Sequence, residues 1–272
     1  MGAVLASLRE RRGRPVSPLK RVAYFFGLPI LLIILWWALS FGSTNFFVPK
    51  PVELAQTLWT TWIGDRFFDD VLPSIGRLAV GLFCAIGLGI VLGLLIGSIR
   101  WLRNLLEPLL EFFRAIPPPV LVPLLMLLIG VNDSMKVAVI ISGAIWPVLL
   151  NTVEGVRAVD SVLNDSCRSY GIRGFARIRY FVLPAVTPQI MAGVRQSLSI
   201  GLILMVISEM FASSSGLGFT IVQFQRNFSI PEMWSGIVVL GLIGLGLALI
   251  FQFVERRVLH WYHGLKEITH DS

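Results

Sequence analysis

The sequence predicts an all-α polytopic membrane protein with about six transmembrane helices. Apolar residues make up 55% of the 272 residues, charged residues make up 14%, and the mean hydropathy is +0.77. A chain of this composition is too apolar for a soluble domain. The net charge of +7 does not indicate nucleic acid binding, because the basic residues form short clusters between apolar runs. That distribution is typical of the cytoplasmic loops of membrane proteins.

The first 21 residues are expected to form a cytoplasmic tail, because they carry six basic side chains and one acidic side chain. Residues 22–41 carry no charge and match the ~20 residues that a spanning helix needs, so we expect an uncleaved first span. A cleaved signal peptide is the alternative, because Ala38 and Ser40 are small. Trp36 and Trp37 favour the span, since tryptophan is enriched at membrane interfaces.

A short amphipathic helix is expected on the outer surface after the first span. Pro51 begins a segment in which Leu54, Leu58 and Trp62 recur every fourth residue.

The second span is expected at residues 78–99, which carry no charge. Within it, Ala85, Gly89, Gly93 and Gly97 recur every fourth residue and share one face. Because small side chains let helix backbones approach closely, this face should pack against another helix.

The third and fourth spans are expected on either side of a short outer turn. Residues 117–119 are consecutive prolines, so one helix must end there and another must begin beyond them. Residues 121–131 are expected as a third span that starts irregularly and faces an interior path, because irregular backbone at membrane depth needs cover from protein or water. The fourth span is expected at residues 137–153, with a kink at Pro147.

Residues 165–184 form an arginine-rich segment between two apolar blocks. Its four arginines cannot cross a bilayer cheaply, so the segment should lie in water as two short helices that meet at a break near Gly171. Two interpretations stay open: a docking element for another protein, or a positive cytoplasmic loop that only sets the topology.

The fifth helix is expected to start near Pro188, with Arg195 at its inner end and Glu209 near its outer end. The serine- and glycine-rich residues 213–218 end it. An outer, partly apolar connection is expected at residues 219–234.

The sixth span is expected at residues 234–254, and six spans place both termini in the cytoplasm. Under this topology eighteen of the 23 lysines and arginines lie inside, as the positive-inside rule requires. The transmembrane domain is therefore expected at residues 22–257, with its cytoplasmic loop at about 155–187 and a cytoplasmic tail at 258–272.

The chain carries no recognisable catalytic set. None of its four lysines lies in a glycine-rich phosphate loop, and no nucleophile, base and oxyanion-stabilising group can be assembled from one membrane face. His260 and His263 near Glu267 are better explained as a solvated tail than as a metal site. We expect no enzymatic activity, no metal and no cofactor in this chain.

Two ionisable residues fall within the expected fifth helix. Arg195 and Glu209 are fourteen residues apart, roughly 21 Å along a helix, so they cannot pair along it and each needs its own partner or water. Glu209 has two interpretations, a gate or pathway residue and an interfacial residue that reaches lipid headgroups. Ser199 and Met205 are candidates to line a path, although serines also serve close helix packing.

The loop resembles the cytoplasmic EAA loop of the permease subunits of ATP-binding-cassette importers. Asp165, Ser166 and Cys167 stand in the place of Glu-Ala-Ala, and Gly171 follows after three residues. Leu183 and Pro184 match the Leu-Pro that ends the pattern, with Phe181 in its aliphatic position. Asp165 is one methylene shorter than the glutamate of the pattern.

Further residues outside the loop occur in the order typical of the nitrate, taurine and alkanesulfonate branch of these permeases. They are Ser74 with Arg77, Arg114, Lys136, Pro147, Asn151, Arg195, Glu209, Gly216 and Gly218.

The resemblance implies a type I importer permease in the bacterial inner membrane with cytoplasmic termini. Its implied partners are a second permease subunit, identical or different, two cytosolic ATPases that bind ATP and magnesium, and an extracytoplasmic solute-binding protein. The implied cargo is a sulfonate, taurine, nitrate or a related small anion. A pyrimidine or flavin precursor is the alternative cargo. A secondary transporter is the alternative class, but the two halves lack the corresponding broken segments that it needs.

The sequence and the resemblance together give two groups of candidate functional residues. The residues expected to couple the permease to the ATPase are Asp165, Ser166, Cys167, Gly171, Ile172, Phe175, Leu183 and Pro184. The candidate pathway or gate residues are Arg114, Trp146, Asn151, Ser199, Met205, Glu209, Gly216 and Gly218.

Overall fold

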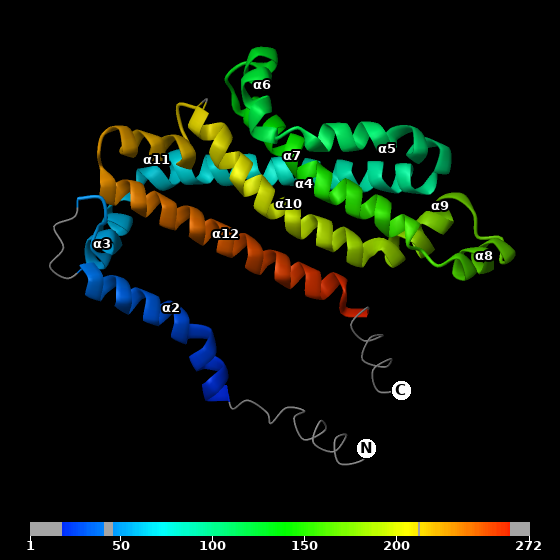
Figure 1. Ribbon diagram of the computed structural model, residues 1–272, viewed down its shortest axis with the longest axis horizontal. Helices are drawn as coiled ribbons and strands as arrows, with labels where there is room; N and C mark the ends of the chain where they lie inside the picture. The colour runs from blue at the N-terminus through cyan, green and yellow to red at the C-terminus, as the bar shows by residue number, and fades with distance from the viewer. Residues whose placement is uncertain (1–17, 41–45, 212, 262–272) are drawn as a thin grey trace.

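The computed structural model describes residues 18–40, 46–211 and 213–261, and its regular structure there is helical throughout. Four helices run side by side along the long axis of the molecule, namely α4, α7, α10 and α12 (Figure 1). The short helices α8 and α9 lie at one end of this bundle, and α3 and α11 lie at the other end (Figure 1). The predicted all-α membrane fold is confirmed.

The N-terminal helix α2 (Pro18–Ser40) begins inside the segment that was expected to be a tail. Proline is well tolerated in the first turn of a helix, which explains a start at Pro18. The rest of the expected tail, residues 1–17, lies outside the described residues. Helix α3 (Pro51–Trp62) confirms the predicted amphipathic helix, with Leu54 and Trp62 buried. The Trp62 Nε1 donates a hydrogen bond of 2.8 Å to Ser235 Oγ, which ties α3 to α12.

Helix α4 (Leu72–Ser98) begins earlier than the expected second span and continues from a π-helical turn, η1 (Phe67–Val71). The expected start at residue 78 assumed that Arg77 ends the apolar segment. That assumption is wrong, because the Arg77 side chain is buried and ion-paired inside the bundle. Charge paired in this way is compatible with a spanning helix.

The predicted small-residue stripe of α4 packs against α7 (Asp133–Arg157). A Cβ atom added at Gly89 would lie 2.8 Å from Val148 Cβ, and one added at Gly93 would lie 2.5 Å from Thr152 Cβ. These distances leave no room for a larger side chain, so the stripe is a contact between two helices.

The expected third span is wrong in its extent. Helix α5 (Arg100–Ala115) ends before the prolines, as predicted, and a short 3-10 turn, η2 (Pro118–Val120), leads into α6 (Leu121–Ile129). Nine residues rise only about 14 Å, less than half of the ~30 Å hydrocarbon core. Helices α5 and α6 form a pair bent by 75° and count together as one candidate span.

The arginine-rich segment folds as predicted into two short helices with a break. Helix α8 (Ser161–Ser169) and helix α9 (Gly174–Arg177) flank Gly171, which has a φ of +72°. Few residues other than glycine adopt this left-handed conformation readily. A second π-helical turn, η3 (Ile178–Val182), joins α9 to the next long helix.

Helix α10 (Leu183–Phe211) starts five residues before the expected Pro188, and α12 (Ile230–Val258) extends beyond both ends of the expected sixth span. The expected outer connection at residues 219–234 is wrong in part. Its first half folds as α11 (Leu217–Arg226), because Leu217 and Phe224 are buried with Trp62 in one apolar cluster.

Among the described residues, four helical segments are long and apolar enough to cross a membrane, and the bent pair α5–α6 would be a fifth. The expected count of six requires α2, which is 23 residues long, as a further span. The largest core cluster lies between α4, α7 and α10, where Met135, Ile140, Ala144 and Met205 are inaccessible to solvent.

Candidate functional site

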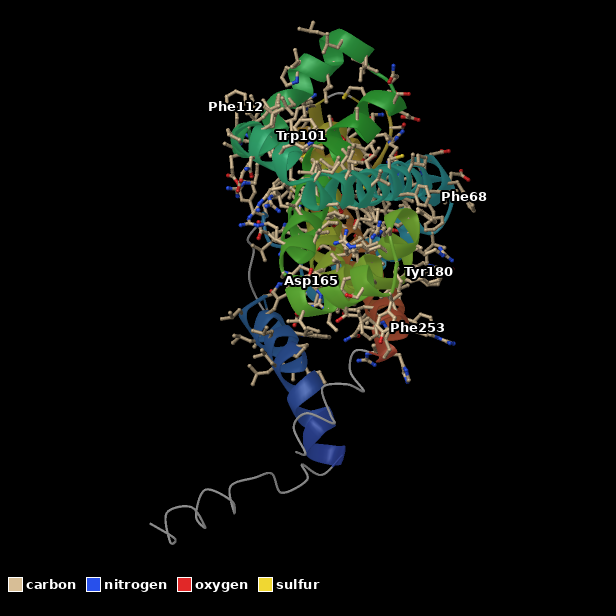
Figure 2. The ribbon with its side chains drawn as sticks, turned by 90° about the vertical axis from the view of Figure 1, so that its right-hand side faces the viewer. Phe68, Trp101, Phe112, Asp165, Tyr180 and Phe253 are labelled. Atoms are coloured by element: carbon tan, nitrogen blue, oxygen red, sulfur yellow. The ribbon has the colours of Figure 1, made fainter. Side chains whose placement is uncertain are left out.

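The loop formed by α8 and α9 presents apolar side chains at the end of the bundle. Tyr170 is 85% exposed and Phe175 is 76% exposed, and Ile172 and Asp165 are also exposed. Figure 2 looks onto this end of the molecule and labels Asp165. Aromatic residues are enriched where proteins bind each other. A loop that only set the topology would not need them, so the composition of this surface favours a docking element.

The same loop is anchored in the two central helices. Pro184 is exposed, whereas Leu183 is partly buried and packs with the buried Val182 and Val186. A Cβ added at Gly155 of α7 would lie 2.5 Å from Val186 Cγ1. The loop therefore joins α10 at a point where α7 and α10 are in close contact.

The remaining loop residues shape the break itself. The Ile172 N–H donates a hydrogen bond of 2.9 Å to the Cys167 carbonyl oxygen, which closes α8. Ser166 Oγ donates to the Val162 carbonyl oxygen at 2.9 Å. Asp165, Ser166 and Cys167 thus lie on one short helix, and their side chains are exposed or half-buried next to the break.

Three candidate pathway residues line one pocket, which we call the Arg114 pocket. It lies between the end of α5, η2, α7 and α10 and has a volume of about 420 Å³. Its lining consists of Arg114, Pro118, Pro119, Gly143, Trp146, Pro147, Leu150, Asn151, Gln196, Ile200, Ile203 and Leu204. Arg114, Trp146 and Asn151 were expected from the sequence; Gln196 was not singled out.

The polar groups of the Arg114 pocket suit an anion. The Arg114 guanidinium is about half exposed and is paired with the Glu111 carboxylate, with Nη2 2.5 Å from Oε2. The Asn151 amide nitrogen donates to the Pro147 carbonyl oxygen at 2.8 Å, and the amide has a second N–H that can donate to an anion. A planar guanidinium with exposed donors is well suited to carboxylate, sulfonate or phosphate oxygens.

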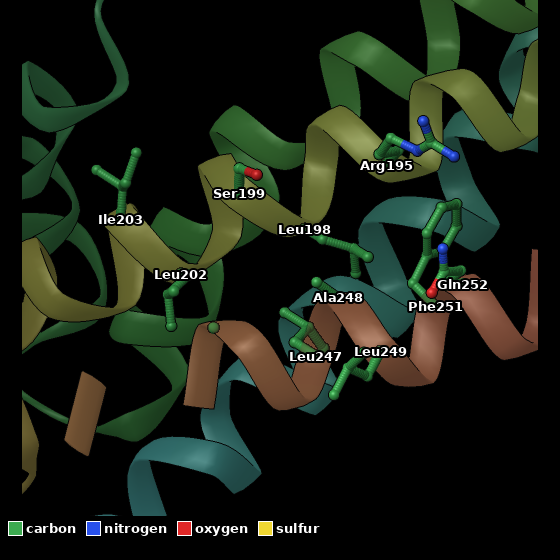
Figure 3. A pocket seen from close by; sticks show the side chains of 11 residues that line it. Arg195, Leu198, Ser199, Leu202, Ile203, Leu247, Ala248, Leu249, Phe251 and Gln252 are labelled. Carbon is green, nitrogen blue, oxygen red and sulfur yellow. The ribbon is translucent and has the colours of Figure 1, made fainter. Parts of the chain in front are cut away.

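Ser199 lies on another side of α10 and lines a second pocket between α10 and α12 (Figure 3). This pocket has a volume of about 700 Å³ and is otherwise largely apolar apart from Arg195 and Gln252. Arg195 pairs with Glu255 of α12 at 2.5 Å and lies 5.6 Å from the centre of the Phe251 ring. The expectation that Arg195 needs a partner of its own is confirmed.

Glu209 lies in a polar group that is buried apart from the exposed Asp133. We call it the Glu209 cluster, formed by Asp70, Ser74, Arg77, Asp133, Lys136, Glu209 and the backbone of residues 215–218. Arg77 Nη1 donates to Glu209 Oε1 at 2.7 Å, and Ser74 Oγ lies 2.8 and 2.9 Å from its two carboxylate oxygens. The Glu209 side chain is completely buried, so it does not reach lipid headgroups as one interpretation required.

The Glu209 cluster also fixes the start of α11. The N–H groups of Gly216, Leu217 and Gly218 donate to Asp70 Oδ1, Ser74 Oγ and Glu209 Oε2, each at 3.0 Å. These donors would otherwise be unpaired at a helix N-terminus. Gly216 has a φ of +114°, and a Cβ there would lie 2.6 Å from the Glu209 carboxyl carbon.

Helix α7 joins the same cluster through Asp133 and Lys136. Arg77 Nε donates to Asp133 Oδ1 at 2.9 Å, and Lys136 Nζ lies 3.2 Å from the same oxygen. The cluster thereby connects α4, α7, α10 and α11 at the end of the bundle opposite α8 and α9. The spacing of Asp70, Ser74 and Arg77 by four and three residues places them on one helix face, a signal that the sequence contained. Met205 is fully buried in the main core and lines neither pocket.

Comparison with known proteins gives consistent results. Residues 85–260 match the family described as binding-protein-dependent transport system inner membrane component. The chain is 30% identical to the putative aliphatic sulfonates transport permease protein of Bacillus subtilis, over 94% of this chain and 92% of that protein. It is 27% identical to the taurine transport system permease protein of Escherichia coli, over 94% and 96%.

The fold resembles a solved importer structure. An inward-facing conformation of the MetNI methionine ABC transporter matches with a TM-score of 0.60 and 16% sequence identity, over 76% of this chain and 96% of that chain. At this identity the match concerns the fold.

Proposed function

We infer a mechanism from one premise: the chain belongs to the inner-membrane components of binding-protein-dependent transport systems, as an importer permease of the nitrate, taurine and sulfonate branch. It is a transport component with several membrane spans. We propose that the Arg114 pocket is part of the translocation path. The observation that carries this proposal is a half-exposed guanidinium beside an open pocket, near the middle of the spanning helix α7.

The proposed cargo is a small organic or inorganic anion such as a sulfonate, taurine or nitrate. The relatives named for sulfonates and taurine support this class, and Arg114 offers a group that binds such anions. A planar pyrimidine or flavin precursor is the second candidate. The Trp146 ring supports it, because it lines the Arg114 pocket and an aromatic face can stack on a planar cargo.

The proposed partners follow from the family and from the loop. Two cytosolic ATPases would bind α8 and α9 through Asp165, the half-buried Cys167 and the exposed Ile172 and Phe175. A second permease subunit and an extracytoplasmic binding protein would complete the importer. Hydrolysis of ATP is then the work of the partner subunits, and α8, α9 and both termini lie in the cytoplasm.

Uptake by cells that express the complete importer tests the assignment of the path. We expect Arg114→Gln to reduce uptake of radiolabelled taurine, nitrate or butanesulfonate at least roughly tenfold, since one charge-assisted hydrogen bond is worth about 1.5–3 kcal/mol. Arg195→Gln is the matched control, because Arg195 faces the other pocket. Equal uptake by both variants would remove Arg114 from the path. Loss of uptake in Trp146→Leu with full activity in Arg114→Gln would favour the planar cargo.

A further inference from the structure

The second pocket, between α10 and α12, is a groove that is polar at one end and apolar along the rest. Arg195 and Gln252 lie at one end, and Leu202 and Ile203 lie at the other (Figure 3). Ile203 is 56% exposed and Leu249 is 57% exposed, so the groove is open to the surroundings of the bundle. We call this pocket the α10–α12 groove.

Small residues on α12 form the floor of the groove. Gly244 and Ala248 are four residues apart and share one helix face with Gln252. Small residues usually let two helices approach closely, but here a volume of about 700 Å³ lies between the helices. A Cβ added at Gly244 would meet the end of the Leu202 side chain at 3.0 Å. The groove therefore has room for another molecule.

The apolar part of the groove has the length of a lipid chain segment. Gly244 and Gln252 are eight residues apart, roughly 12 Å along the axis of the spanning helix α12. One leaflet contributes half of the hydrocarbon core, which is ~30 Å thick in all. The groove thus extends through most of one leaflet, and its apolar lining suits a hydrocarbon chain better than water.

Basic side chains gather at the polar end of the groove. A guanidinium has five N–H donors, and one of them serves the ion pair of Arg195 with Glu255. The Arg195 side chain is 64% exposed, so its outer donors face the surroundings. Arg256 and Arg257, in the last turn of α12, are also exposed. Three arginines beside one glutamate leave this end with a net positive charge.

The groove and the arginines lie in the order in which a lipid presents its chain and its headgroup. Arg256 lies four residues beyond Gln252 on the same face of α12, roughly 6 Å nearer the end of the helix. A phosphate diester there would accept charge-assisted hydrogen bonds from guanidinium groups. Basic pockets between membrane helices are a recurring kind of site for anionic headgroups.

Helix α2 of a second copy would complement the groove less well than a lipid. Residues 22–41 carry no charge that could pair with the arginines. Lys20 and Arg21, near the start of α2, are themselves basic. In the six-span topology the start of α2 and the end of α12 lie on the same side of the membrane, so these two residues would repel Arg256 and Arg257.

We propose that the α10–α12 groove binds an anionic phospholipid, with one acyl chain in the groove and the phosphate at Arg195. Arg256 and Arg257 make the site selective, because they attract a headgroup with a net negative charge and repel the ammonium of a zwitterionic one. The site goes beyond the proposed function. Only its place in the inner leaflet rests on the proposed cytoplasmic position of the C-terminus.

Photo-crosslinking of lipids tests the site. The complete importer is placed in nanodiscs that contain a low mole fraction of phosphatidylglycerol or of phosphatidylcholine, each with a diazirine in the middle of one acyl chain. The labelled residues are identified by mass spectrometry after illumination. Leu242 and Ile250 are the reference for ordinary lipid contact, because they are exposed on α12 and do not line the groove.

We expect phosphatidylglycerol to label Leu202 and Ala248 roughly 20-fold more than phosphatidylcholine does, after normalisation to the reference residues. Each of two arginines near an anionic headgroup contributes about a factor of five. Equal labelling by the two lipids would mean ordinary lipid contact without a site. Labelling of Leu242 and Ile250 with none in the groove would mean that protein covers it. Either result overturns the proposal.

Two variants separate the headgroup from the chain. Arg195→Gln combined with Arg256→Gln should bring the labelling by phosphatidylglycerol down to that by phosphatidylcholine. Arg226→Gln is the matched control, because Arg226 is exposed at the other end of the bundle, in the last turn of α11. Ala248→Trp fills the groove without a change of charge and should remove the label from Leu202. Unchanged labelling in Ala248→Trp would place the lipid elsewhere, and this variant decides if the arginine variant fails to assemble.

The outcome is separable from the proposed function. If the groove is labelled selectively but Arg114→Gln transports normally, the lipid site stands and the path assignment is wrong. If labelling is unselective but Arg114→Gln abolishes uptake, the path assignment stands without the lipid site. Arg195→Gln alone keeps Arg256 and Arg257, so its groove still attracts anionic lipid and the variant remains a control for Arg114.

Discussion

Replacing Glu209 by glutamine removes one charge from the Glu209 cluster without changing the size of the side chain. The carboxylate accepts from three donors, Arg77 Nη1, Ser74 Oγ and the Gly218 N–H. A glutamine has one acceptor oxygen, so an amide N–H₂ that turns away from Arg77 would face the Gly218 N–H. The variant leaves a buried donor unpaired and Arg77 without one of its two carboxylates.

The loss of stability in Glu209→Gln can be estimated from these contacts. An unsatisfied buried donor costs about 1–3 kcal/mol, and breaking a buried ion pair costs about 3–5 kcal/mol in all. For a chain of this size that corresponds to a fall of roughly 10 °C in the melting temperature. The assay is the loss of the intact, detergent-solubilised complex on heating, followed by size-exclusion chromatography at one heating rate, because unfolding of such complexes is irreversible.

Glu255→Gln provides the matched control. It removes the same charge from an ion pair whose partner, Arg195, is 64% exposed, so the cost should stay below about 1 kcal/mol. The double variant Arg77→Met with Glu209→Leu should be more stable than Arg77→Met alone, since it leaves no buried carboxylate at residue 209 without its arginine. Equal melting temperatures for Glu209→Gln and Glu255→Gln would refute the claim that the buried ion pair contributes more to stability than the exposed one.

Three further predictions follow from the fold. Gly93→Leu should reduce the yield of the assembled complex severely, because a Cβ there would already lie 2.5 Å from Thr152 Cβ; normal yield would place this face in lipid. Gly171→Val should keep expression but weaken co-purification of the ATPase, since a left-handed φ of +72° costs a β-branched residue about 1–2 kcal/mol; unchanged co-purification would leave the loop as a topology signal. A cysteine at Arg173 should react with an impermeant thiol reagent from the cytoplasmic side alone and one at Asn227 from outside alone, and the reverse pattern would invert the topology.

The local features of the fold could be predicted from the sequence. The proline run predicted the break between α5 and α6, and Gly171 predicted the turn between α8 and α9, because both signals act through the backbone of a few neighbouring residues. The small residues around Gly93 predicted a helix contact, because small side chains let helix backbones approach closely. The sequence did not identify α7 as the partner.

The predictions from sequence were wrong where contacts between residues distant in the chain determine the structure. Arg77 was expected to limit the second span, but Glu209, which is distant in the sequence, neutralises it inside the bundle. Residues 219–226 lack a strong apolar pattern and fold as part of α11 because Trp62 and Ser74 contact that helix. The expected pathway residues were separated for a similar reason, since α10 presents Ser199, Met205 and Glu209 to three different surroundings.

The uninterrupted length of α10 has a mechanical consequence. Its far end is held by the Glu209 cluster, while its first residue, Leu183, continues directly from the loop. Leu183 and Gln196 lie roughly 39 and 20 Å along the axis from Glu209. A tilt of α10 about its anchored end therefore displaces Gln196 only about half as far as Leu183. Helix α10 would thus act as a lever with its fulcrum at Glu209, turning a wide stroke at α8 and α9 into a shorter and more forceful movement at the Arg114 pocket.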